Sequence, residues 1–140
     1  MPAYGGNHFP NGSCEEPNKS ASPSKTGCGY AGDTRLYVAP NADMFAADLS
    51  GMELTGAKPM DVNFWDATLK SGNFTNADLR RGNFYNADFA GSLLSEANMW
   101  GANLTGANLD GAILDGVFGN DNTICPNGKL RSDKNSDCGF

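Results

Sequence analysis

The sequence has no long apolar run, a single histidine and few basic residues. No stretch of its 140 residues is long and apolar enough to span a membrane, and no apolar signal segment follows Met1. Lys and Arg number 10 against 16 Asp and Glu, and no basic patch for nucleic acid is present. His8 has no partner at a spacing typical of a catalytic triad, and phosphate-binding glycine loops and paired metal ligands are absent from the sequence. We therefore expect neither enzymatic activity nor a cofactor.

What the sequence has is a five-residue repeat that runs from Ala42 to Gly116. In each block one residue, here called the centre, is large and apolar, with Pro59 as the exception, and a small residue usually lies two positions before it. The fifteen centres are Met44, Leu49, Leu54, Pro59, Phe64, Leu69, Phe74, Leu79, Phe84, Phe89, Leu94, Met99, Leu104, Leu109 and Leu114. A five-residue step turns about 140° around a helix and alternates faces on a strand, so neither element can bury the centres. The pattern predicts a chain that turns a corner in every block and stacks coil on coil.

The blocks at 77–81, 87–91, 102–106 and 107–111 read ADLRR, ADFAG, ANLTG and ANLDG. They resemble the pentapeptide-repeat family, whose consensus is Ala-(Asp/Asn)-Leu followed by two variable residues. The resemblance implies an all-β fold, a right-handed quadrilateral parallel β-helix (solenoid) with four blocks to a coil, so that residues twenty apart stack. Fifteen blocks would make 3.75 coils, a rod of about 18 Å at a strand spacing of ~4.8 Å.

The small-residue positions support a period of twenty independently of the resemblance. Met52 and Val62 are too large for their positions, and the equivalent positions one coil later are Gly72 and Gly82. We expect bulk on one level to be offset by glycine on the next, because the interior must be densely packed.

Composition and periodicity divide the chain into four segments. Residues 1–30 form a Gly/Pro/Ser-rich irregular N-terminal arm, and residues 31–41, with the apolar run Leu36, Tyr37 and Val38, cap the coil. Residues 42–116 are the coil, and residues 117–140 form a C-terminal capping segment that covers its other end.

Four cysteines flank the coil and none lies within it. Because the rod separates the two sets, we expect local disulfides, Cys14 with Cys28 and Cys125 with Cys138, each closing a loop of roughly fifteen residues. Zinc is the alternative, but the spacings lack a CxxC pair and His8 lies off the pattern. Disulfides indicate an oxidising compartment, so we expect a secreted, extracellular or periplasmic protein whose signal peptide preceded Met1, with a cytoplasmic location as the alternative.

Two columns of side chains are candidates for a binding surface. In the fold that the resemblance implies, the residue after each centre points outward, and on one side of the rod it is Phe45, Trp65, Tyr85 and then Thr105. We call the first three the aromatic column. An adjacent side carries the mixed column, Met60, Arg80 and Trp100. Aromatic, Met and Arg side chains are typical of interface hot spots, and stacked rings also suit carbohydrate.

Acidic residues suggest two further interpretations. The coil carries ten Asp and Glu against four Lys and Arg, and some members of the family mimic duplex DNA and bind gyrase. A rod of this length would need about ten net charges to match DNA, roughly twice what the coil has. Asp133, Asn135 and Asp137 alternate like the start of a calcium loop, but Cys138 occupies the place where that loop needs glycine.

We therefore expect a non-catalytic, extracytoplasmic scaffold or binding module that presents its aromatic surface to a protein partner or to a second copy of itself. The alternatives are a cytoplasmic acidic inhibitor of a DNA-binding enzyme such as gyrase, and a carbohydrate-binding module. We expect neither binding to nucleic acid nor insertion into a membrane.

Overall fold

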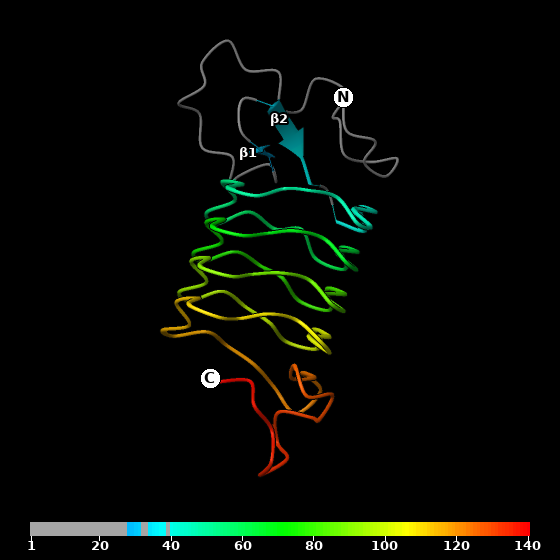
Figure 1. Ribbon diagram of the computed structural model, residues 1–140, viewed down its shortest axis with the longest axis vertical. Helices are drawn as coiled ribbons and strands as arrows, with labels where there is room; N and C mark the ends of the chain where they lie inside the picture. Colours follow the sequence, from blue (N-terminus) through cyan, green and yellow to red (C-terminus); the bar gives the residue numbers. More distant parts are fainter. Residues whose placement is uncertain (1–27, 32–33, 39) are drawn as a thin grey trace.

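The computed structural model describes residues 28–31, 34–38 and 40–140, and it shows a rod of stacked coils (Figure 1). Parallel β-bridges join residues twenty apart, such as Asp43 with Asn63 and Asn63 with Asn83. This spacing confirms the all-β, four-sided solenoid predicted from the sequence. We number the sides by their centres, so that Met44, Leu49, Leu54 and Pro59 begin sides 1, 2, 3 and 4.

Backbone hydrogen bonds hold each coil to the next. The N–H of a centre donates to the next coil, as Phe64 does to the carbonyl of Asn83 at 2.8 Å. The residue before the centre donates in the opposite direction, as Asn63 does to the carbonyl of Ala42 at 2.8 Å. Every side therefore carries a short parallel ladder, and the last level leaves backbone groups that only another segment or solvent can satisfy.

The centres fill the interior of the rod. All of them from Met44 to Leu104 are buried, including Pro59, whereas Leu109 and Leu114 in the last coil are only partly covered. Phenylalanine rings form the middle of this core: Phe89 lies 5.3 Å from Phe84 and 5.6 Å from Phe74 between ring centroids. The apolar residues that recur every five positions in the sequence thus form the core of the molecule.

The glycines at positions 72 and 82 have a different cause from the expected one. A Cβ built on Gly72 would lie 2.5 Å from the ring of Phe74, and a Cβ on Gly82 would lie 2.5 Å from the ring of Phe84. In both cases the space is filled by the centre of the same block. The three atoms nearest to this Cβ on Gly72 belong to Phe74 and Leu69, and none belongs to Met52. The glycine therefore makes room for the ring of its own block rather than for bulk one coil away.

Each corner of the coil combines a left-handed backbone with a side-chain hydrogen bond. The second residue after a centre has positive φ even where it is not glycine, as at Ala46 (56°), Arg81 (56°) and Glu96 (59°). The residue before the centre is usually Asp or Asn, and its carbonyl or carboxylate oxygen accepts the N–H two residues later, as Asn98 does from Trp100 at 3.1 Å. The repeat selects Asp and Asn because these short side chains close the turn.

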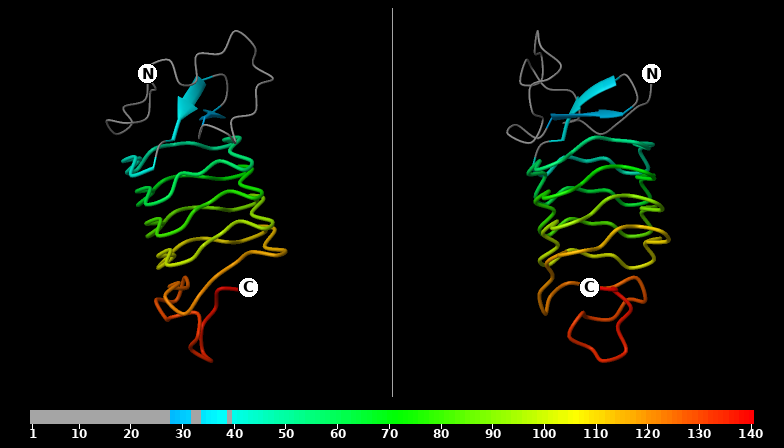
Figure 2. Two further views of the ribbon diagram at one scale, coloured as in Figure 1. Left: turned by 180° about the vertical axis from the view of Figure 1, so that it is seen from behind. Right: turned by 90° about the vertical axis from the view of Figure 1, so that its left-hand side faces the viewer.

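An antiparallel hairpin lies at the N-terminal end of the rod (Figures 1 and 2). It consists of β1 (Cys28–Ala31) and β2 (Thr34–Tyr37), in the register that pairs Cys28 with Tyr37. Val38 follows β2 and is fully buried with the core. Residues 1–27, which hold most of the expected arm together with Cys14 and His8, lie outside the described residues.

At the opposite end the ladder continues past Gly116. Phe118 pairs with Asn98 twenty residues earlier, and Ile124 then pairs with Asn103 across 21 residues, so one extra residue has entered the coil. Ile124 also pairs in antiparallel fashion with Leu130, where the chain turns back. The segment that was expected only to cap the coil also contributes part of another level.

Candidate functional site

The aromatic column lies on side 1 and is exposed. Phe45 and Trp65 are 53% and 41% exposed, and Tyr85 is half-buried. Their backbone positions are fixed within their own blocks: the N–H groups of the three residues donate to the side chains of Asp43, Asn63 and Asn83, two residues earlier, at 3.2, 3.1 and 3.2 Å. The rings therefore project from a rigid ladder and do not belong to the core.

Neighbouring rings in this column touch at an angle. Phe45 and Trp65 have centroids 6.4 Å apart and planes inclined by 62°, while Trp65 and Tyr85 are 4.9 Å apart and inclined by 51°. No two neighbours share a plane, so the column presents ring edges and partial faces. This relief fits interdigitating side chains better than a flat ligand.

The mixed column lies on side 4 and has an ion pair at its middle. The Arg80 guanidinium binds Asp78 through two hydrogen bonds of 2.8 Å and also lies 3.0 Å from the sulfur of Met60. Because its guanidinium donates hydrogen bonds to the Asp78 carboxylate, the pKa of Arg80 is raised above its ordinary value. Trp100, which lies one coil after Arg80, is 50% exposed. Sides 4 and 1 share a corner, so the two columns lie on adjoining sides of the rod.

Sequence reasoning missed a second group of exposed apolar residues. Leu93 and Ile113 form a bridged pair on side 3 and are 42% and 43% exposed, and Phe118 and Leu130 are also exposed. Leu93 and Ile113 occupy the position before a centre, where the repeat otherwise favours Asp, Asn or Thr. That departure from the turn chemistry was a visible signal.

The acidic residues of the coil are distributed over all four sides, and most of them take part in local bonds. Hydrogen bonds from the hydroxyl and then the N–H of Ser50 lower the pKa of Asp48, and a hydrogen bond from Arg81 lowers the pKa of Asp61. Asp61 and Arg81 stack one coil apart at 2.8 Å, and Lys70 reaches Asp88 at 3.5 Å. The described part of the coil therefore shows no continuous acidic stripe of the kind that a DNA duplex presents.

The calcium candidates are used in loop contacts. Asp133 accepts the N–H of Asn135 at 2.8 Å, and Asp137 accepts the N–H of Asn127 at 2.8 Å. Among the described residues no three His, Cys, Asp or Glu side chains gather into a possible metal site. The described segments also include no helix that could cross a bilayer.

The C-terminal disulfide is present as expected. Cys125 and Cys138, both buried, are bonded, with Cα atoms 4.6 Å apart. Its proposed counterpart, Cys14 with Cys28, involves a residue outside the described part of the chain, and that pairing stays a prediction.

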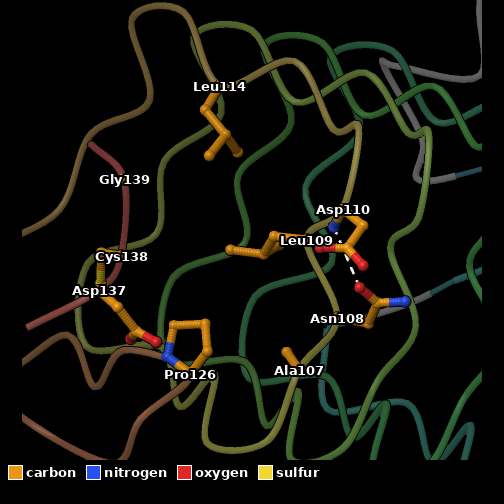
Figure 3. Close-up of a pocket in the computed structure, with 9 residues that line it drawn as sticks. All are labelled: Ala107, Asn108, Leu109, Asp110, Leu114, Pro126, Asp137, Cys138 and Gly139. Atoms are coloured by element: carbon orange, nitrogen blue, oxygen red, sulfur yellow. Dashed lines mark hydrogen bonds between the residues drawn. The ribbon is translucent and has the colours of Figure 1, made fainter.

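A cavity of about 300 Å³ lies between the last coil and the C-terminal segment (Figure 3). Leu109 and Leu114 point into it from the open end of the core, and the opposite wall is formed by Pro126 and by residues 137–139. Asp110 and Asp137 lie at its edge. The cavity is the place where the last level of the solenoid is not completed.

Comparison with known proteins agrees with this architecture. Residues 60–95 and 83–118 match the model of the family "Pentapeptide repeats", with eight copies. The structure is similar to the pentapeptide-repeat protein Rfr23 from the cyanobacterium Cyanothece 51142, with 34% identity, a TM-score of 0.57, and coverage of 57% of this chain and 54% of that one. No curated protein gave a match.

Two further solved structures share the fold. HetL from the cyanobacterium Nostoc sp. strain PCC 7120, a pentapeptide-repeat protein involved in heterocyst differentiation regulation, is 32% identical with a TM-score of 0.60, over 63% of this chain and 40% of that one. QnrB1, a plasmid-mediated fluoroquinolone resistance protein, is 22% identical with a TM-score of 0.52, over 56% and 41%, and this likeness shows the fold alone. The chain thus spans about half or less of each relative. By its repeat and its right-handed quadrilateral β-helix, this chain belongs to the pentapeptide-repeat family.

Proposed function

We propose that this chain is a non-catalytic, extracytoplasmic scaffold that binds a partner protein, or a second copy of itself, through the aromatic and mixed columns. The observation that carries the proposal is the exposure of Phe45, Trp65 and Trp100 on a rigid, regular rod. Exposed large aromatic residues held in place lose little side-chain entropy on binding, and Trp, Tyr and Arg dominate the energetics of protein interfaces.

The tilt of the rings favours a protein over a carbohydrate. Stacking on a sugar needs ring faces that are open to solvent, whereas Trp65 contacts both Phe45 and Tyr85 at inclinations of 62° and 51°. The resulting ridges and notches match the side chains of a protein surface.

The distribution of charge argues against an acidic DNA mimic. Asp48, Asp78 and Asp88 each accept the N–H two residues later, so they are explained by the corners of the coil. Three of the coil's carboxylates also form ion pairs with Lys or Arg side chains. A mimic would need unpaired charges in register along one face.

The disulfide supports a location outside the reducing cytoplasm. Cys125 and Cys138 fasten the segment that covers the end of the core, and a bond of this kind persists in oxidising compartments. A mass measurement on protein from its native source should show this bond, and two free thiols at these positions would contradict the location.

A double variant tests the contact surface. Replacing Trp65 and Trp100 with Ser should leave the melting temperature nearly unchanged, because both rings lie outside the core. Binding to the partner, or self-association measured by sedimentation, should weaken by roughly thirtyfold, the equivalent of about 2 kcal/mol.

The matched control is Leu93→Ser with Ile113→Ser, which removes two similarly exposed apolar side chains from side 3. This control should bind like the wild type. If the two double variants bind equally well, the columns are not the contact surface; if the Trp variant unfolds, its rings are structural.

A further inference from the structure

The rod ends unevenly at its C-terminal end. On sides 4 and 1 the last coil is covered, since Met99 donates to the carbonyl of Phe118 and Leu104 donates to that of Ile124, both at 2.8 Å. On side 2 the N–H groups of Leu109 and Gly111 and the carbonyl of Ala107 find no hydrogen-bond partner among the described residues. These three groups are the ones that a further coil would bind.

The exposed edge of side 2 borders the cavity described above. Leu109, a centre of the core that is only partly covered, points into this cavity of about 300 Å³ (Figure 3). The C-terminal segment forms the far wall at Pro126 and Cys138 and leaves the edge of side 2 uncovered. An apolar site thus lies beside unpaired backbone groups, which is the combination that strand addition uses.

Side 3 offers less room. Gly139 lies against Leu114 so closely that a Cβ on it would come within 3.2 Å of the Leu114 side chain. The C-terminal segment therefore covers part of side 3, and one added block on side 2 is what the space admits.

The charge of the site defines the partner. Asp110 and Asp137 line the cavity, and no Lys or Arg is among its lining residues. The carboxylate of Asp137 is oriented by the N–H of Asn127, and Asp110 is exposed in the position that follows the centre. A segment with basic residues on either side of an apolar residue complements this arrangement.

We propose that the C-terminal end of the rod binds an extended basic segment of a partner protein, which adds to side 2 as a parallel strand and places an apolar side chain over Leu109. The register of the added strand follows from the hydrogen-bond pattern of the preceding coils. The residue before the apolar one donates its N–H to the carbonyl of Ala107, and its own carbonyl accepts from Leu109. The residue after the apolar one accepts from Gly111 and lies over Asp110.

The test uses a fluorescein-labelled peptide, Lys-Ala-Asn-Leu-Lys-Gly-Lys, and the whole protein with its disulfide intact. Fluorescence polarisation should show saturable binding, and NMR hydrogen exchange should show that the amide protons of Leu109 and Gly111 become protected. Methylating the backbone nitrogen of the Asn removes the donor to Ala107 and should weaken binding about fivefold or more.

Protein variants separate this site from the aromatic columns. Asp110→Lys should weaken binding about fivefold, while Asp66→Lys, a charge reversal at another exposed position, on side 1, should not. The Trp65→Ser, Trp100→Ser variant should bind the peptide normally, so this inference can fail or hold independently of the proposed function.

Three results would overturn the proposal. The first is absence of saturable binding, and the second is equal binding of the methylated peptide, which would indicate charge attraction alone. The third is protection of Leu109 and Gly111 in the protein alone together with a dimer in sedimentation, which would identify the occupant as a second copy of the chain.

Discussion

Replacing Gly72 with Ala tests the packing of the core at a single atom. The added Cβ would lie 2.5 Å from Cε2 of Phe74, 3.1 Å from its Cζ and 3.2 Å from the carbonyl oxygen of Leu69. The ring must therefore move within a closely packed stack, because the backbone oxygen cannot. Overpacking of this kind costs about 1 to 3 kcal/mol of unfolding free energy, and the lower flexibility of Ala in the unfolded chain offsets about 0.4 to 1 kcal/mol.

Phe74→Leu removes the obstructing ring and should cost about 1 to 2 kcal/mol by itself. Once the ring is gone, Ala at position 72 should add almost no further loss, so a double-mutant cycle should give a coupling of about 1 to 2 kcal/mol. Urea unfolding followed by circular dichroism, with the disulfide intact, measures each variant. The comparison pair is Gly72→Ala with Met52→Ala. Rescue by the Met52 change and none by the Phe74 change would refute this account and restore compensation between coils.

Other substitutions test the corners, one buried group and one ion pair. Ser92→Ala should raise the unfolding free energy by about 1 to 2 kcal/mol in denaturant melts, because the buried Ser92 hydroxyl has no hydrogen-bond partner among the described residues; a loss would show that this hydroxyl is satisfied. Ala46→Gly should stabilise by about 1 kcal/mol because φ is 56° there, whereas the same change at Ala90, which lacks positive φ, should destabilise, and equal effects would contradict the strain argument. The lowered pKa of Asp61 stabilises the fold above about pH 4, and this contribution disappears as the pH falls further. Asp61→Asn should therefore lose less stability than the wild type between pH 6 and 3, with a difference under about 1 kcal/mol because the pair with Arg81 is exposed.

The coil could be predicted from the sequence because each five-residue block forms one side of it. Every block contributes one inward-pointing centre, so the order of the sides and the pairs at a spacing of twenty follow directly, as the bridge between Asn83 and Asn103 shows. The outward position of Trp65 and Trp100 follows from the same register, and the structure places both on the surface.

Other features depend on contacts that the period does not encode. The ladder reaches Ile124 through one extra residue, and an insertion of that kind breaks the pattern by which blocks are recognised. The inclination of Trp65 against Tyr85 depends on side-chain rotation, and the cavity beside Leu109 depends on the path of a segment without repeats. The local sequence contains no direct signal for the inclination of these rings or for the cavity.

Site-specific photo-cross-linking tests the central claim, that the aromatic and mixed columns form the contact surface, most directly. Benzoylphenylalanine would replace Trp65 or Trp100, and in control proteins it would replace Leu93 or Ile113, which are similarly exposed on side 3. Irradiation in the native source should give the same discrete adduct, or a covalent dimer, from positions 65 and 100 and none from positions 93 and 113. Adducts from the side 3 positions alone, or equal adducts from all four, would contradict the claim.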